Sequence, residues 1–208
     1  MKVRSLCPWF CAMLLLAASA IPVRAQSDAT DAERQFLWQE ANAAAARANT
    51  PEDYLRVAAK YQQLGDMGAR NGTLFYNMGT VLLGAGQYEQ AWQALLRAER
   101  YLGNTGDLQQ NLALAFARRS GQDTPTLPWY RVLLFWHFGL AAPVRGAVAC
   151  AAFAIVCLLL AWRTARRNRA LAPLLVVAAI VFILFGSSYV TTLAQEAHAP
   201  RLVLTLKP

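Results

Sequence analysis

Three long apolar stretches divide the chain into a short N-terminal segment, a central polar region and a hydrophobic C-terminal region. The stretches cover residues 6–21, 146–162 and 170–194. A long run without charge is typical of a targeting signal or a membrane span, whereas the central region has the amphipathic spacing of helices that bury one face. We therefore expect an all-α chain with one soluble helical domain and a membrane part.

The first apolar stretch has the three parts of a secretory signal peptide. Lys2 and Arg4 precede an apolar core, and Val23 and Ala25 are the small residues at the −3 and −1 positions of a cleavage site. The apolar run is shorter than the roughly 20 residues that a comfortable span needs. We expect residues 1–25 to be a signal peptide, and the alternative is an uncleaved signal anchor. In both cases the residues from 26 onward cross a membrane.

Capping signals divide residues 26–124 into predicted helices. Thr30-Asp31-Ala32-Glu33 has the pattern of a capping box, and Thr50-Pro51-Glu52-Asp53 places a threonine N-cap before a proline at the first helical position. Glycines that favour a left-handed conformation end three of the helices, at Gly86, Gly103 and Gly121. The expected helices cover about 30–48, 51–64, 73–85, 87–102 and 107–120.

The predicted helices repeat at an interval of 34 residues, which is the period of tetratricopeptide (TPR) repeats. Three pairs have this separation: Tyr54 and Tyr88, Asn77 and Asn111, and Leu64 and Ala98. The central unit, residues 72–105, is the most complete. The positions that define the repeat core are Tyr54, Phe75, Gly79, Leu82, Tyr88, Ala91 and Ala98. The alternative is a generic amphipathic bundle, because alanine-rich helices match loose patterns easily.

Repeat domains of this kind bind peptides or protein surfaces in a groove lined by the first helix of each unit. The groove residues that we expect here are Gln39, Asn42, Tyr76, Asn77, Thr80 and Asn111. Their side chains offer neutral hydrogen bonds to a peptide backbone. The alternative for each asparagine is a hydrogen bond between helices or at a helix cap.

The C-terminal apolar runs predict a transmembrane hairpin with spans at 144–162 and 170–194. The connecting loop, residues 163–169, carries four basic residues: Arg163, Arg166, Arg167 and Arg169. The positive-inside rule places this loop in the cytoplasm. The repeat domain and the tail at 195–208 then lie in the periplasm, which is also the side that a signal peptide predicts. We expect a protein of the inner (cytoplasmic) membrane.

An aromatic run precedes the hairpin within the linker segment, residues 125–143. It extends from Pro128 to Phe138 and contains Trp129, Tyr130 and Trp136. Because Trp and Tyr prefer the headgroup level of a membrane, the run predicts an interfacial helix. The alternative is a helix buried beneath the repeat domain.

The net charge of +8 would suit nucleic-acid binding, but its distribution does not. Residues 26–126 carry nine basic and eleven acidic side chains, and the positive charge lies beside the apolar stretches. Basic residues in such positions orient a chain in a membrane, so we expect no nucleic-acid partner. The four cysteines lie in the apolar stretches and fit neither a disulfide framework nor a zinc motif.

Catalytic chemistry is not indicated by any motif. The only histidines, His137 and His198, lie far apart in the sequence, and no phosphate-binding loop or metal-binding motif is present. Glu52 and Asp53 fit a charge pair at a helix N-terminus better than an acid/base dyad. We therefore expect no catalytic residues, no metal site and no cofactor.

Three stretches and their order suggest a family. Residues 74–79 read LFYNMG, residues 111–115 read NLALA and residues 134–138 read LFWHF, and a two-helix hairpin follows them. This arrangement resembles the BatE-type tetratricopeptide membrane proteins of the aerotolerance (Bat) operon. The resemblance implies partners with von Willebrand factor A (VWA) domains and a MoxR-type AAA+ ATPase, in stress tolerance or assembly of envelope complexes. Many relatives continue into an SH3-like domain after the second span, where this sequence has residues 201–208.

Taken together, the sequence predicts a non-enzymatic scaffold that binds protein partners at the membrane. The alternative is a small accessory subunit of a transporter or channel, whose hairpin would be the working part. Polar residues inside the spans would favour that alternative, and they are scarce. A membrane enzyme would need a cluster of ionisable groups, which the sequence does not indicate.

Overall fold

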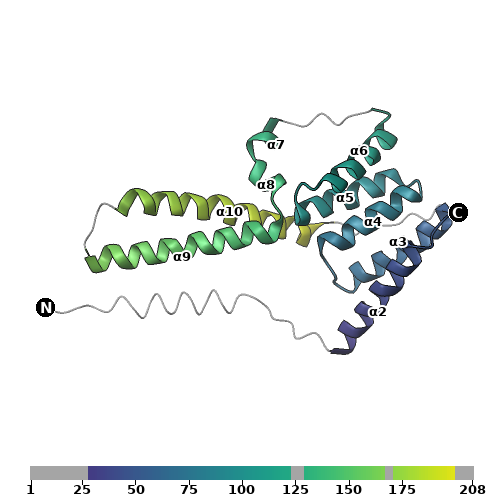
Figure 1. Ribbon diagram of the computed structural model, residues 1–208, viewed down its shortest axis with the longest axis horizontal. Helices are drawn as coiled ribbons and strands as arrows, with labels where there is room; N and C mark the ends of the chain where they lie inside the picture. The colour runs from purple at the N-terminus through teal and green to yellow at the C-terminus, as the bar shows by residue number, and fades with distance from the viewer. Residues whose placement is uncertain (1–27, 123–128, 167–170, 200–208) are drawn as a thin grey trace. The chain divides into compact units, whose positions relative to one another are not determined.

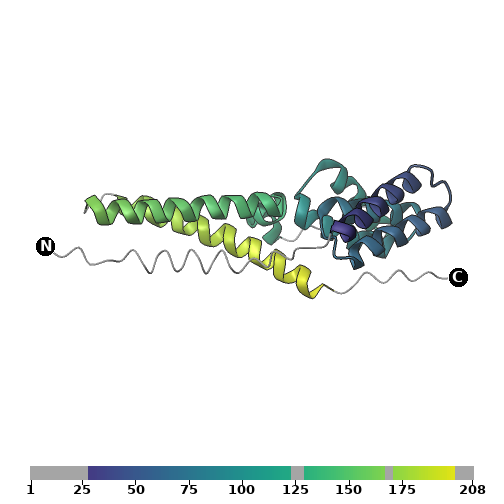
Figure 2. The same ribbon diagram turned by 90° about the horizontal axis from the view of Figure 1, so that it is seen from below.

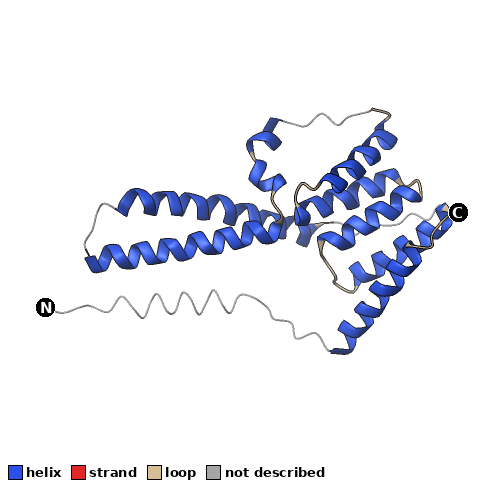
Figure 3. Ribbon diagram, in the orientation of Figure 1, coloured by secondary structure: helices blue, strands red, loops and turns tan. Residues whose placement is uncertain are grey.

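The computed structural model describes residues 28–122, 129–166 and 171–199, which form helices joined by turns (Figures 1 and 3). None of these ranges contains a strand, so the all-helical prediction is confirmed for them. Three expected features lie outside the described residues. They are the signal peptide with its cleavage site, the arginines Arg167 and Arg169 of the loop, and the tail after Ala199.

The helices between residues 28 and 122 begin and end close to the expected positions. They are α2 (Asp28–Ala45), α3 (Pro51–Asp66), α4 (Gly72–Gly84), α5 (Tyr88–Leu102) and α6 (Gly106–Ser120). Two expectations for α2 are wrong. The chain is already helical at Asp28, so Thr30 is not its N-cap, and α2 ends at Ala45, three residues early, where a turn leads to Thr50.

Two compact units divide the chain within α2, between Phe36 and Leu37. The described part of the first unit, Asp28–Phe36, is the first half of α2, where Arg34 forms an ion pair with Asp31 one turn earlier. The second unit begins at Leu37 and includes α3 to α10. We call its residues 37–122 the helical domain.

The beginning of α3 shows the predicted capping box. The Thr50 hydroxyl accepts a hydrogen bond from the Asp53 amide at 3.2 Å, and the Asp53 carboxylate accepts one from the Thr50 amide at 3.1 Å. These bonds satisfy amides that have no partner inside a helix. The hydrogen bond with the Thr50 side chain, followed by those from the Asn49 and Thr50 amides, lowers the pKa of Asp53 below its ordinary value. Asp53 is therefore a capping residue of α3.

Replacing Thr50 with alanine should lower the free energy of unfolding by about 1 kcal/mol, because one amide of α3 loses its acceptor. Thr105 provides a matched control, since it is the N-cap of α6 but its side chain makes no capping hydrogen bond. Urea denaturation of both variants, followed by circular dichroism, would measure the difference. Equal losses for Thr50→Ala and Thr105→Ala would contradict this assignment of the cap.

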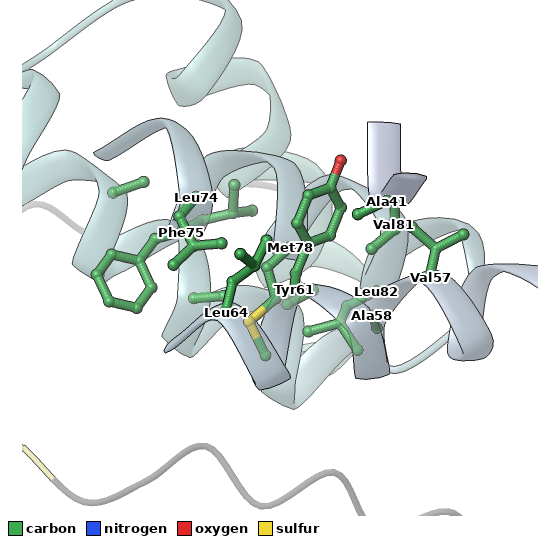
Figure 4. Packing of buried hydrophobic residues seen from close by; sticks show 14 of the residues in the cluster. Ala41, Val57, Ala58, Tyr61, Leu64, Leu74, Phe75, Met78, Val81 and Leu82 are labelled. Atoms are coloured by element: carbon green, nitrogen blue, oxygen red, sulfur yellow. The ribbon is translucent and has the colours of Figure 1, made fainter. Parts of the chain in front are cut away.

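The core of the helical domain lies between consecutive helices (Figure 4). In α3 the buried residues are Val57, Ala58, Tyr61 and Leu64, which share one helical face. Figure 4 shows them facing Leu74, Phe75, Met78, Val81 and Leu82 of α4. Further along, α5 buries Ala91, Ala94, Leu95 and Ala98, and α6 buries Leu108, Leu112 and Ala115. Each helix therefore packs on the next one in the chain.

Helices α4 and α5 approach each other closely at Gly79. A Cβ atom added to Gly79 would lie 2.6 Å from Cγ of Leu95 and 3.3 Å from the Ala91 carbonyl oxygen. The small residues expected at 79 and 91 are therefore required by the close approach of the two backbones. Of the other expected core residues, Leu82, Ala91 and Ala98 are fully buried and Phe75 nearly so, whereas Tyr54 and Tyr88 are half-buried.

Two short helices carry the aromatic run, α7 (Trp129–Leu133) and α8 (Phe135–Gly139). Trp129 is 76% exposed and Phe135 is 66% exposed, and α8 has no buried residue. The run is therefore not a helix buried beneath the helical domain. Exposed aromatic side chains next to an apolar hairpin fit the expected interfacial position.

The hairpin consists of α9 (Ala142–Arg166) and α10 (Ala172–His198), which pack along each other in both views (Figures 1 and 2). Both helices are longer than the expected spans. Arg163 and Arg166 lie in the last turn of α9 instead of a loop, because alanine and arginine are strong helix formers and cations are favourable at a helix C-terminus. Residues 195–198, expected in the tail, continue α10.

Both hairpin helices are long and apolar enough to cross a membrane. Only 17% of the apolar window of α9 and 11% of that of α10 are buried, whereas the core helix of a soluble protein would be mostly covered. Large side chains such as Leu158 (70% exposed) and Ile183 (62% exposed) face outward. An apolar surface of this extent is favourable in lipid and unfavourable in water.

Candidate functional site

The expected groove residues lie along α2, α4 and α6, and we call them the amide face. Its members are Gln39, Asn42, Tyr76, Asn77, Thr80 and Asn111. Gln39 and Thr80 are exposed, and the other four are half-buried. These polar side chains therefore lie on three helices, α2, α4 and α6.

Hydrogen bonds within the amide face connect neighbouring helices in the same register. The Asn77 amide of α4 donates to Asn42 Oδ1 of α2 at 3.3 Å, and the Asn111 amide of α6 donates to Tyr76 Oη at 3.4 Å and to Thr80 Oγ1 at 3.1 Å. The first two of these bonds each span 35 residues. The asparagines thus make bonds between helices, while Gln39 and Thr80 of this face are exposed.

Asn42 has a structural role that can be separated from partner binding. Its Oδ1 also accepts a hydrogen bond from the Tyr61 hydroxyl at 2.6 Å, and Tyr61 is 1% exposed. Desolvation raises the pKa of Tyr61, and the hydrogen bond with Asn77 opposes this shift. The phenol is therefore a neutral donor that needs an acceptor inside the domain.

Replacing Asn42 with alanine should destabilise the helical domain by about 1–3 kcal/mol, because the buried Tyr61 hydroxyl loses its acceptor. Asn111→Ala should cost less than about 1 kcal/mol, since Thr80 is exposed and can bond to water instead. Urea denaturation of the full chain in detergent, followed by circular dichroism, compares the two variants. A larger loss for Asn111→Ala would contradict the assigned roles.

A second polar group, which we call the junction cluster, connects the helical domain to the linker and the hairpin. It consists of Glu99, Arg100, Arg131, His137, Arg145, Ser188 and Glu196. Arg145 lies in the first turn of α9. Ser188, Thr192 and Glu196 form a buried stripe on α10, because they are spaced four positions apart along the helix. The cluster therefore joins residues of α5, α7, α8, α9 and α10.

Arg145 lies at the centre of the cluster and is 0% exposed. Its guanidinium donates to Ser188 Oγ at 2.8 Å, to the Ser188 carbonyl at 3.1 Å and to the Arg100 carbonyl at 2.9 Å. It also donates to His137 Nδ1 at 3.1 Å. Because Nδ1 is an acceptor, a neutral His137 carries its proton on Nε2.

Two ion pairs cross the junction cluster. Arg100 donates to Glu196 Oε1 at 2.8 Å, and Arg131 pairs with Glu99. Arg70 donates to the backbone carbonyl of Glu196 at 2.8 Å, which adds a contact from the turn between α3 and α4. The side chains of Glu196 and Glu99 are 5% and 7% exposed, so these pairs are shielded from water on their acidic side.

The backbone approaches closely at the same place. Gly103, predicted only as a helix end, has a φ of 74°, and a Cβ atom there would lie 2.7 Å from both the Gly139 carbonyl oxygen and the Ala141 amide nitrogen. The Asn104 amide donates to the Gly139 carbonyl at 3.2 Å. The turn after α5 therefore packs directly on the segment between α8 and α9.

The junction cluster was missed by the sequence interpretation, which treated Arg131 and Arg145 as charges that orient the chain. Glu196 was placed in the tail. One signal was available, since Ser188, Thr192 and Glu196 repeat at helical spacing in the second apolar run and Arg145 interrupts the first. Of the expected topology residues, Arg163 is exposed at the end of α9, Arg166 ends that helix, and Arg167 and Arg169 lie outside the described residues.

The described residues contain no group of three or more His, Cys, Asp or Glu side chains that could hold a metal ion. His137 and His198, although both are described, have separate partners: His137 contacts Arg145 and Ser188, and His198 contacts the carbonyl of Ala194. The titratable groups that do converge lie in the junction cluster. There Arg100 pairs with Glu196 and Arg131 pairs with Glu99.

Comparison with known proteins gives no match to this chain. No protein-family model matches it, and no curated protein or solved structure is significantly similar to it. The function is therefore argued from the amide face, the junction cluster and the hairpin.

Proposed function

We propose that this protein is a non-enzymatic, membrane-anchored scaffold whose helical domain is a TPR-type repeat that binds protein partners. The observation that carries the proposal is the amide face, a polar surface that crosses three helices of a domain joined to an apolar hairpin. Amide and hydroxyl groups in such a row suit an extended peptide or a partner's loop, because they can bond to backbone groups of any sequence.

The TPR assignment is supported by geometry as well as by spacing. Helices α4 and α6 begin at Gly72 and Gly106, which are 34 residues apart, the TPR period. The hydrogen bonds from Asn77 and Asn111 recur in the same register, and α4 crosses α5 closely at Gly79. A generic bundle has no reason to repeat its polar contacts at one interval.

The location that we propose is the inner (cytoplasmic) membrane, with the helical domain and the C-terminus in the periplasm. Support comes from the outward-facing apolar side chains of α9 and α10 and from the arginines at the hairpin tip. The resemblance to BatE-type proteins suggests VWA-domain membrane proteins and a MoxR-type ATPase as partners, in stress tolerance or envelope assembly. A scaffold of this kind would hold its partner next to other membrane subunits.

Site-specific photo-crosslinking in membranes tests the proposed binding face. A photoreactive residue at Gln39 or Thr80, both exposed on the amide face, should give a discrete protein adduct. Matched control positions are Gln63 of α3 and Gln93 of α5, which are exposed on the second helices of the units. Equal adducts at all four positions, or adducts only at the controls, would count against the amide face as the binding surface.

A further inference from the structure

Arg145 is buried, and it has no carboxylate partner within residues 28–122, 129–166 and 171–199. Its hydrogen bonds go to neutral groups, namely a serine, two backbone carbonyls and a histidine. None of the ion pairs among the described residues includes it, and its Nε is a buried donor without a hydrogen-bond partner. Because arginine stays protonated in proteins, the site holds a buried positive charge that lacks an anion, an arrangement that is costly by itself.

The surroundings of Arg145 are also positive. Within the junction cluster, Arg100, Arg131 and Arg145 face only two carboxylates, Glu99 and Glu196, and both are already paired. Burial, and then the charges of Arg145 and Arg100, lower the pKa of His137 below its ordinary value. Both causes favour the neutral imidazole, and the three arginines of the cluster outnumber its two carboxylates.

A hollow gives access to this charge. It has a volume of about 210 Å³ and is lined by Arg100, Arg131, His137 and Arg145, with Glu99 and Gln195 at its side. Arg145 lies in the first turn of α9, where the helix dipole also favours an anion. Arg100, Arg131 and Arg145 all line this hollow. The forked geometry of the guanidinium donors matches the spacing of the oxygens of a phosphate.

An apolar neighbour distinguishes a lipid from a soluble anion. A second hollow, of about 400 Å³, shares His137, Phe138 and Gln195 with the first and is lined by Trp136 and Leu184. Tyr130 of α7 also lines this hollow, and both Tyr130 and Leu184 are exposed. A ligand with a phosphate head and an apolar body would fit both hollows.

We infer that the junction cluster binds the phosphate of an anionic phospholipid headgroup, with Arg145 as the central ligand and Arg100 and Arg131 beside it. The glycerol backbone and the first acyl carbons then occupy the second hollow. The lipid supplies the anion that Arg145 lacks and fastens the helical domain to the hairpin. This inference rests on the proposed membrane location and is independent of any protein partner.

Native mass spectrometry of the detergent-solubilised full chain tests the inference with phosphatidylglycerol as the probe. We expect one molecule of phosphatidylglycerol to bind about tenfold more tightly than phosphatidylcholine, whose ammonium group is repelled by the cluster. Arg145→Met and, as a second variant, Arg131→Gln should each weaken binding by about tenfold. Arg163→Gln, which removes the same charge from the opposite end of α9, should leave it unchanged.

Two further measurements keep the outcomes distinct. Circular dichroism reports whether Arg145→Met is folded. If that variant is unfolded, Arg131→Gln replaces it in the comparison, because Arg131 lies on the short helix α7. Alkaline extraction of membranes reports anchorage, so release of the protein would contradict the proposed function. Retention in the membrane together with equal binding of both lipids, or an equal loss for Arg163→Gln, would overturn the inference. Displacement of phosphatidylglycerol by millimolar inorganic phosphate would overturn the lipid as the source of the phosphate.

Discussion

Replacing Gly79 with leucine should unfold the helical domain or lower its free energy of unfolding by about 3 kcal/mol or more. Even a Cβ atom would lie 2.6 Å from Cγ of Leu95, and Leu95 is itself 0% exposed and cannot move aside. The larger side chain would force α4 away from α5, and these two helices form the most extensive helix pair of the helical domain. Urea denaturation of the full chain in detergent, followed by circular dichroism, would measure the loss.

Gly65→Leu is the control for this experiment. Gly65 is also a helical glycine, in the last turn of α3, but nothing lies within 4 Å of a Cβ atom built on it. Leucine is the better helix former by up to about 1 kcal/mol, so this variant should be as stable as the original chain or more so. Similar losses for Gly65→Leu and Gly79→Leu would show that the crossing at Gly79 is not the limiting contact.

The second large effect is expected at Glu196. Glu196→Gln removes the carboxylate that pairs with Arg100 and leaves the arginines of the junction cluster with Glu99 as their remaining partner among the described carboxylates. Breaking a buried pair by removing one partner costs about 3–5 kcal/mol, and we reduce this to about 2 kcal/mol because the Arg100 side chain is 34% exposed. The contact between the helical domain and α10 should weaken accordingly.

Hydrogen exchange measures this loss locally, since the last turn of α5 and the last turn of α10 should exchange faster while the core of α4 stays protected. Glu89→Gln is the matched control, because its ion pair with Arg119 is exposed on both sides and should contribute less than about 1 kcal/mol. Unchanged exchange at the end of α10 in Glu196→Gln would refute the role of the junction cluster as a connection.

Local features of the fold could be predicted because their causes lie within a few residues of one another. The capping box at Thr50 and Asp53 is complete within four positions, and Gly86, Gly103 and Gly121 all have a positive φ at the ends of helices, as expected. In each case a short pattern has one physical explanation.

The junction cluster could not be predicted in this way, because its contacts join distant parts of the chain. Arg145 meets Ser188 across 43 residues, and Arg100 meets Glu196 across 96. A single arginine beside an apolar run is ordinarily a snorkelling or orienting charge. Arg145 is buried because α5, α8 and α10 supply its hydrogen-bond partners. The helix ends at Arg166 and His198 were also missed, since no Gly or Pro marks the expected boundaries.

The orientation of the chain across the membrane is the claim on which the scaffold role depends, and cysteine labelling tests it directly. With the native cysteines replaced by alanine, Ser120→Cys and Asn168→Cys each introduce one thiol, the first at the end of α6 and the second between α9 and α10. We expect a membrane-impermeant maleimide to label Ser120→Cys once the outer membrane is opened, and Asn168→Cys only after the inner membrane is broken. Labelling in the opposite order would place the helical domain in the cytoplasm and contradict the account.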